Sequence, residues 1–140
     1  ATYYYQLMQY NRLLQQRNAV LKEYRGKNTI PLEEWDLQLA DMASFIVKKR
    51  LESLKKINLL IDLMNRKLTG GLENLTIGYE QPYMDNGSLE YTKEGFYERI
   101  KAALPQDRHR LSTSVGPHRD DLRFFSDAMD LKKFGKYISR

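Results

Sequence analysis

The sequence predicts a mainly helical α+β protein, in which a long antiparallel helical hairpin joins a small antiparallel β-sheet and one short helix. Apolar residues recur at spacings of three and four through residues 2–24 and 31–69, which is the helical period. After residue 71 the pattern changes to short runs rich in β-branched and aromatic residues, typical of strands. We therefore expect a hairpin arm over residues 1–71 and a small α/β base over residues 72–140, together one structural domain.

The amino-acid composition argues against a disulfide-bonded, metal-binding or membrane-spanning protein. The 140 residues include no cysteine, which excludes disulfides and thiolate metal sites and fits a reducing cytoplasm. No apolar run is long enough to cross a bilayer, so we expect a soluble, cytoplasmic protein that makes no membrane contact. His109 and His118 are the only histidines, and their spacing is no metal signature. We expect no metal site.

The first helix is expected over residues 2–24. A near-heptad seam runs along it, with Arg17 at a position that should be apolar; the seam consists of Tyr3, Leu7, Tyr10, Leu14 and Leu21. Gly26 and the polar residues after it predict a short turn, and a short turn implies an antiparallel partner.

The second helix is expected to be unusually long. Pro31 suits its first turn, acidic residues follow near the positive end of its dipole, and Gly70-Gly71 ends it. We expect one apolar stripe along its whole length, formed by Trp35, Leu39, Met42, Ile46, Ile57, Leu60, Met64 and Leu68. Arg50 falls within the angular sector of this stripe, either with its head reaching outward or in a buried pair.

Basic residues gather on another face of the long helix. Between residues 48 and 67 the sequence has seven basic residues against two acidic ones, within a chain of net charge +5. At about 100° per residue they form two rows: the first row is Lys48, Lys55 and Arg66, and the second row is Lys49, Lys56 and Lys67. Leu59 and Leu63 lie between the rows. Such a surface suggests a nucleic acid or another polyanion, or simply a soluble helix end suited to its dipole.

The C-terminal half is expected to alternate strands with one helix. Strands are predicted at residues 75–79, 111–115 and 121–125. Thr92 is expected to cap a helix that Pro105 ends. Turn signals occur at Asn86-Gly87 and at residues 126–128.

A charged run follows the second of these strands. A rigid Gly-Pro bend leads into four ionisable residues, in the order Gly116, Pro117, His118, Arg119, Asp120 and Asp121. Taken alone, the run is either a charged turn in which Arg119 pairs with an aspartate or a functional cluster. Its place between the bend and two carboxylates leads us to expect that Arg119 is partly buried.

Several motifs together resemble the RecF family of bacterial recombination-repair proteins. They are the Gly-Pro-His-Arg-Asp-Asp-Leu run after a threonine-containing strand, the Tyr10–Asn18 segment, the Trp35–Ala40 segment, and residues 134–140, which resemble the approach to the family's signature sequence. They span nearly the whole chain in the family's order. Leu111 departs from the glycine that family members often carry.

The resemblance implies an ABC-type ATPase related to structural-maintenance-of-chromosomes proteins. In the full-length protein, ATP and magnesium would be bound, and ATP would drive homodimer formation. This chain has no Gly-x-x-x-x-Gly-Lys-Ser/Thr loop, so we expect it to be an arm lobe without the parts that bind and hydrolyse ATP, with no catalytic residue and no cofactor of its own.

The resemblance also implies partners: double-stranded DNA near single-strand gaps, and RecR acting with RecO to load recombinase. We expect this chain to contact DNA, RecR or both. The basic rows are suited to DNA phosphates, and Leu59 and Leu63 are better suited to a protein partner, but the sequence does not assign either surface to a partner. By family position, the run from Gly116 to Asp121 would organise the base of the arm. The alternative is a purely structural lever that transmits the ATP state. A free-standing enzyme using His118 is disfavoured, because no nucleophile or metal pattern accompanies it.

Overall fold

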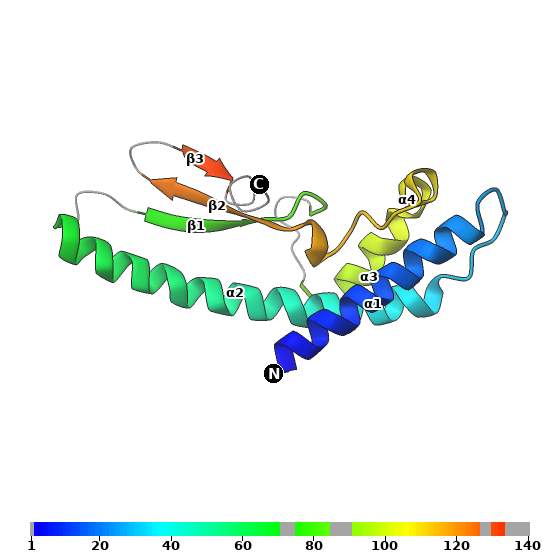
Figure 1. Cartoon of the computed structure of the whole chain (residues 1–140), viewed down its shortest axis with the longest axis horizontal. Helices are drawn as coiled ribbons and strands as arrows, with labels where there is room; N and C mark the ends of the chain where they lie inside the picture. The colour runs from blue at the N-terminus through cyan, green and yellow to red at the C-terminus, as the bar shows by residue number, and fades with distance from the viewer. Residues whose placement is uncertain (1, 71–74, 85–90, 127–129, 134–140) are drawn as a thin grey trace. The chain divides into compact units, whose positions relative to one another are not determined.

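The computed structural model describes residues 2–70, 75–84, 91–126 and 130–133. Its elements, in chain order, are α1 (Thr2–Glu23), α2 (Glu33–Thr69), β1 (Leu75–Glu80), α3 (Lys93–Ala102), α4 (Leu104–Arg110), the 3-10 turn η1 (Pro117–Arg119), β2 (Asp121–Ser126) and β3 (Asp130–Lys133) (Figure 1). The strands form one antiparallel sheet in the order β1-β2-β3. The mainly helical α+β fold predicted from the sequence is confirmed.

The chain divides into two compact units. One, called here the helical unit, combines residues 1–48 and 83–119; the other, the sheet unit, combines residues 49–82 and 120–140. Helix α2 contributes to both, and the chain passes from one unit to the other after Lys48. Each unit therefore takes segments from both sides of residue 71, where we expected the arm to end.

Helix α1 and the beginning of α2 form the expected antiparallel hairpin within the helical unit (Figure 1). Gly26 has a φ of 77°, a left-handed conformation that glycine adopts without a steric penalty. Across the two helices, Trp35 Nε1 donates a hydrogen bond of 3.2 Å to Gln16 Oε1. The predicted antiparallel pair of helices joined by a short turn is confirmed.

Helices α1, α2 and α3 supply the core of the helical unit. Its fully buried apolar side chains come from all three helices: Tyr10, Leu21, Leu39, Ile46, Val47, Phe96 and Ile100. At the start of α3, the Thr92 hydroxyl accepts a hydrogen bond from the backbone N–H of Gly95, so the predicted N-cap is confirmed. This core is therefore assembled from segments that are far apart in the sequence.

The helix that Thr92 caps was predicted to end at Pro105, and α3 ends shortly before it, at Ala102. The sequence did not predict that Pro105 lies in the first turn of a further helix, α4, where proline is tolerated because its missing N–H is not needed. Leu111 ends α4 with a φ of 59°, an uncommon left-handed conformation for a residue with a side chain. This is also the position at which the sequence departs from the family's glycine.

The predicted strand at residues 111–115 was wrong. The segment is irregular, and Thr113 and Val115 are buried in it. Its β-branched residues suggested a strand, but its polar groups bond to side chains of α1 and α4 rather than to a neighbouring strand. The strands predicted at residues 75–79 and 121–125 are confirmed as β1 and β2.

In the sheet unit, α2 runs along β1, which is an edge strand of the sheet. The Asn58 side chain accepts a hydrogen bond of 2.8 Å from the Ile77 N–H and donates one of 3.0 Å to the Ile77 carbonyl. Ile77 is paired in register with Phe124 of β2. A single amide therefore satisfies both backbone groups of Ile77 on the open side of the edge strand.

The apolar stripe expected along all of α2 is correct only in the helical unit. Leu39 and Ile46 are buried, but Ile57, Leu60, Met64 and Leu68 are 44–80% exposed. In the sheet unit, the side facing β1 instead carries Asn58. Helical spacing places Asn65, which is buried, on the same side as Asn58. The same spacing places Leu51, Leu54 and Ile61, which are half-buried, on this side as well. A different face of α2, with two asparagines among its apolar residues, therefore lies toward β1, and the expected stripe is exposed.

Helix α2 ends as predicted at Gly70, which has a φ of 69° and donates its N–H to the Arg66 carbonyl. The turns predicted at Asn86-Gly87 and at residues 126–128, and the motif at residues 134–140, lie wholly or mostly outside the described residues. None of the described helices is both long enough and apolar enough to span a membrane.

Candidate functional site

Arg17 is the centre of a buried polar network in the helical unit. Its Nε donates to Asp36 Oδ1 at 2.7 Å, and its Nη1 donates to Asp107 Oδ2 at 2.8 Å and to Thr113 Oγ1 at 2.9 Å. The Arg17 side chain is completely buried. One guanidinium therefore joins α1, α2, α4 and the loop after α4, which explains why an arginine stands at an apolar position of the α1 seam.

The charges in this network are not balanced one to one. Arg17 faces two buried carboxylates, those of Asp36 and Asp107. Burial raises the pKa of Asp36 above its ordinary value, although Arg17 beside it acts in the opposite direction. Removing the guanidinium would leave both carboxylates buried without their cation.

Side chains rather than a strand ladder fix the loop after α4. Asn18 Oδ1 accepts from the Thr113 N–H at 2.9 Å and from its hydroxyl at 2.7 Å. Asp107 Oδ1 accepts from the Ser114 N–H at 3.1 Å and from its hydroxyl at 2.7 Å. The sequence analysis did not predict Asp107. The one signal for it was Arg17 at an apolar position of the α1 seam, because a buried guanidinium needs an acidic partner.

Gly116 is required by the close approach of Tyr10. Its φ is 136°, and a Cβ built on it would lie 1.9 Å from the Tyr10 hydroxyl oxygen. No side chain fits there without displacing Tyr10 or the loop. The Gly-Pro pair of the charged run is thus explained by packing against α1, and Pro117 next to it is buried.

His118 is held in one neutral form by two hydrogen bonds. Its Nε2 lies 2.8 Å from the Thr113 carbonyl oxygen, and its Nδ1 lies 2.8 Å from the Tyr10 hydroxyl. Because a carbonyl only accepts, we assign the proton to Nε2, so that Nδ1 accepts from Tyr10. Burial lowers the pKa of His118 below its ordinary value. The residue is therefore set up as a structural neutral imidazole.

Arg119, Asp120 and Asp121 do not form the partly buried cluster that we expected. The Arg119 side chain is exposed, so the expectation that it is partly buried was wrong. Asp120 accepts a hydrogen bond from the Tyr79 hydroxyl, which in turn accepts one of 3.3 Å from Arg50. Burial, as the largest cause, raises the pKa of Tyr79 well above its ordinary value. Arg50 thus serves in a part-buried pair within the sheet unit.

The six basic residues predicted to contact DNA are all exposed on α2. Two of them form exposed ion pairs within the helix, Lys49 with Glu52 at 3.7 Å and Arg66 with Asp62 at 3.3 Å. Exposed pairs of this kind hold their partners weakly. All six positive charges are therefore accessible on the surface of the described residues.

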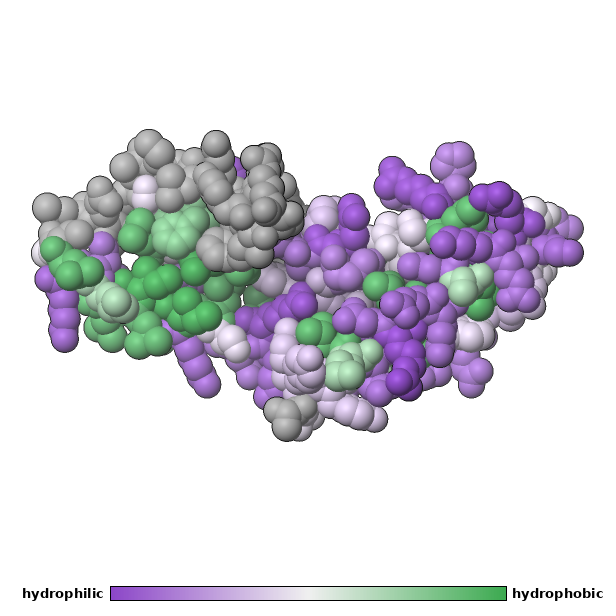
Figure 2. Space-filling view, viewed as in Figure 1, coloured by the Kyte–Doolittle hydropathy of each residue, from purple (hydrophilic) through white to green (hydrophobic). Residues whose placement is uncertain are grey.

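Leu59 and Leu63, predicted as an anchor for a protein partner, are 60% and 58% exposed. The C-terminal half of the predicted α2 stripe, Ile57, Leu60, Met64 and Leu68, is exposed beside them. We call the set of exposed apolar residues the outer face of α2; it comprises Ile57, Leu59, Leu60, Leu63, Met64 and Leu68. Figure 2 shows hydrophobic residues gathered over the distal part of this helix.

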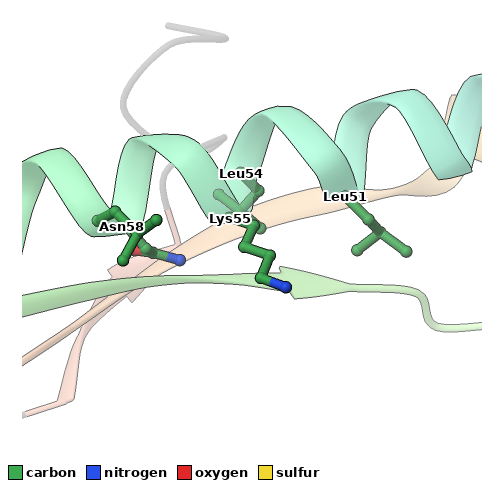
Figure 3. A pocket seen from close by; sticks show the side chains of 5 residues that line it. Leu51, Leu54, Lys55 and Asn58 are labelled. Atoms are coloured by element: carbon green, nitrogen blue, oxygen red, sulfur yellow. The ribbon is translucent and has the colours of Figure 1, made fainter.

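An open hollow of about 410 Å³ lies beside the outer face, lined by Leu51, Leu54, Lys55, Asn58 and Leu59. Figure 3 shows Lys55 and Asn58 extending on the side of α2 where β1 runs. The Asn58 amide is already bonded to Ile77, which leaves Lys55 as the one lining side chain with a charge to offer. The hollow therefore lacks the convergent polar groups of a small-molecule site.

Within the part of the chain that the structure describes, no group of three or more His, Asp or Glu side chains could hold a metal ion. The candidate functional surfaces are therefore the basic rows and the outer face of α2. The Gly116–His118 part of the charged run and the segments around Tyr10 and Asp36 instead come together as the internal framework of the helical unit.

Comparison with curated proteins finds close sequence relatives. The chain is 39% identical over 133 residues to the DNA replication and repair protein RecF of Clostridium botulinum strain Eklund 17B, and 38% identical over 135 residues to that of Alkaliphilus oremlandii. The RecF protein of Halothermothrix orenii is 37% identical over 139 residues. Each match covers 95% of this chain but only 36–37% of the relative, so the chain spans about a third of their length. No model of a known protein family matches the chain.

Solved structures agree with these relatives. The recombination mediator protein RecF in the RecFOR pathway, in its ATP form, superimposes with a TM-score of 0.80 at 29% identity. A second structure of the same protein, RecF-ATPrS, gives a TM-score of 0.76 at 28% identity. Both cover 92% of this chain and 35% of the solved chain. Over this segment, the chain belongs to the RecF family of DNA replication and repair proteins.

Proposed function

We propose that the chain is a non-catalytic arm region of a RecF-like recombinational DNA-repair ATPase and that it contacts double-stranded DNA. The relatives are named for DNA replication and repair, and their length leaves about two thirds of such a protein outside this chain. ATP, which is named with the solved RecF structures, would be bound by those other parts together with magnesium. The chain has no phosphate-binding loop in its sequence.

The observation that carries the DNA proposal is the exposed first basic row on α2. Lys48 and Lys55 are exposed, and Arg66 is held only by a pair with Asp62 in which its own side chain is 69% exposed. Exposed lysine and arginine side chains neutralise backbone phosphates without reading the base sequence. The second row, which includes Lys56 and Lys67, is interleaved with the outer face and is less suited to this task.

A salt titration of the full-length protein tests this proposal. Reversing the charges at Lys48, Lys55 and Arg66 should weaken duplex binding for every sequence alike and lower the salt slope by about 0.9 per lost phosphate contact. Replacing Leu59 and Leu63 with serine should leave the slope unchanged. An unchanged affinity and slope after the charge reversal would remove DNA contact from this helix.

The chain itself is expected to release no phosphate from ATP. A phosphate-release assay on the 140-residue chain should read background. Turnover that persists through further purification and disappears on Asp120→Ala would overturn the non-catalytic assignment.

Two further roles remain candidates for the same region. RecR, together with RecO, is the partner to expect from the RecFOR pathway named with the solved structures, and the exposure of Leu59 and Leu63 favours a protein contact there. The alternative is a structural lever that couples ATP-dependent dimerisation to the rest of the protein. Titration of the full-length protein with duplex DNA, and separately with RecR, distinguishes a ligand-binding arm from a lever. If the region is only a lever, substitutions on α2 should change ATP-dependent dimerisation without changing the affinity for DNA or for RecR.

A further inference from the structure

The outer face of α2 is too apolar to be a permanent solvent-exposed surface. Its six large side chains lie within four turns of one helix, and each is 44–80% exposed in the described structure. Single exposed leucines are ordinary, but a contiguous group of this size marks an interaction site.

Among the described residues, the sheet unit shows no closed core of its own. The twelve buried hydrophobic residues of the described part of the chain all belong to the helical unit. Among the side chains described in residues 49–82 and 120–126, only Asn65 is buried. A helix and a small sheet become stable when packed layers enclose an apolar interior between them. In the described residues, one such layer on the far side of α2 is absent.

The charges on the outer face indicate what kind of surface would cover it. Lys56 and Lys67 stand among the apolar side chains, and neither forms an ion pair within the described residues. Phosphates would satisfy the two lysines but would leave six apolar side chains against a polar backbone. A protein surface with an apolar stripe and carboxylates opposite the lysines satisfies both.

We propose that the outer face is covered by a further layer of the same polypeptide in a full-length RecF-like protein, an apolar surface with carboxylates opposite Lys56 and Lys67. The curated relatives and solved structures are nearly three times as long as this chain, which leaves ample chain to supply that layer. A permanent covering also accounts for the shallow burial of the described side chains in the sheet unit, which a partner that binds only occasionally would leave exposed between encounters. The proposal rests on the chain being part of such a protein. It leaves DNA contact by the first basic row untouched, and it excludes DNA from Lys56 and Lys67 and RecR from Leu59 and Leu63.

Thiol labelling of the full-length protein tests the proposal, since this segment contains no cysteine. In a background without reactive cysteines, Leu60→Cys and Met64→Cys should react roughly tenfold or more slowly than Gln15→Cys, an exposed control on α1. The protection should be present without DNA, without RecR and at low protein concentration. Rates equal to the control would overturn the proposal.

Three other outcomes identify a different occupant and would also overturn it. Protection that appears only with added RecR assigns the face to that partner. Protection that grows with protein concentration assigns it to a second copy, and protection only with duplex DNA assigns it to nucleic acid. Where the cysteine variants fail to fold, Lys56→Glu replaces them: it should lower the melting temperature of the full-length protein, whereas the control Lys55→Glu, outside the outer face, should not.

Discussion

The helical unit and the sheet unit differ in what they bury. The helical unit encloses apolar side chains from three helices together with a charged network centred on Arg17, whose side chain is fully buried. The sheet unit buries only Asn65 among its described side chains and leaves six large apolar residues of α2 exposed. The first unit thus encloses a core of its own, whereas the second depends on a surface from elsewhere.

This difference divides the motifs found in the sequence into two groups. The Gly116–His118 part of the charged run and the segments around Tyr10 and Asp36 meet inside the helical unit, where they hold the loop after α4 in place. The basic and apolar residues on the distal part of α2 have no such internal task. Substitutions should therefore change stability in the first region and binding in the second.

The largest effect is expected from Arg17→Met. The substitution leaves Asp36 and Asp107 buried without their cation, which should lower the free energy of unfolding by about 3–5 kcal/mol. Urea unfolding of the 140-residue chain measures it. Arg12→Met on the exposed side of the same helix is the matched control and should change little. Equal stability of the two variants would show that the network does not hold the helical unit together.

Gly116→Ala should follow closely, with a loss of about 2 kcal/mol or more from backbone strain and the clash with Tyr10. Gly116→Ala should cost less in a Tyr10→Phe background than in the wild type, because the hydroxyl that lies 1.9 Å from the new Cβ is already absent there. Tyr10→Phe alone measures the separate loss of the hydrogen bond to His118. Gly26→Ala, at a positive φ in open space, is the control for strain alone. An equal cost of Gly116→Ala in both backgrounds would contradict the clash.

Asn58→Ala tests the weaker sheet unit. It removes both side-chain hydrogen bonds to Ile77 and should cost about 1–3 kcal/mol. The Ile77 amide should then exchange with deuterium faster than in the wild type, which NMR can follow residue by residue. Ser53→Ala, an exposed change on the same helix, should leave that rate unaltered. If Ile77 stays equally protected, the edge of β1 is covered by something other than Asn58.

A smaller effect is expected from pH. The pKa of His118 is lower in the folded than in the unfolded chain, so the unfolded chain binds the proton first. Its contribution to stability is therefore complete above the unfolded pKa of about 6.5 and is lost as the pH falls below it. Asp107, Arg17 and Arg119 are the charged groups that act on the ring.

Unfolding measured between pH 7.5 and pH 5 checks this sign. His118→Gln should lose less stability across that range than the wild type, while His109→Gln, on the exposed side of α4, should behave like the wild type. The same slope in all three proteins would mean that His118 is not held neutral.

The smallest effect is expected from Arg119→Ala. The side chain is exposed, so the free energy of unfolding should change by no more than about 0.5 kcal/mol. The sequence alone suggested a larger loss, from a buried pair with an aspartate. A melting temperature that falls as far as in Gly116→Ala would restore that earlier interpretation.

Local signals in the sequence were sufficient for the helices and two of the strands. The turn at Gly26, the cap at Thr92 and the stop at Gly70 depend on the residues next to them, and all three are confirmed. The sequence predictions failed where contacts with residues distant in the chain determine the local structure. Residues 111–115 have the composition of a strand, yet they bond to Asn18 and Asp107, and Pro105 begins a helix that no local pattern announced.

The sequence by itself determined the helical period, the antiparallel hairpin, the family and the exposed basic rows, because each depends on residue type and spacing along one element. Only the tertiary structure decided which half of the α2 stripe is buried, since that depends on whether α1 and α3 or an edge strand lies opposite. It also decided that Arg17 rather than Arg119 is the buried arginine. A buried charge is stable only where oppositely charged groups surround it, and Asp36 and Asp107 reach Arg17 from two other helices.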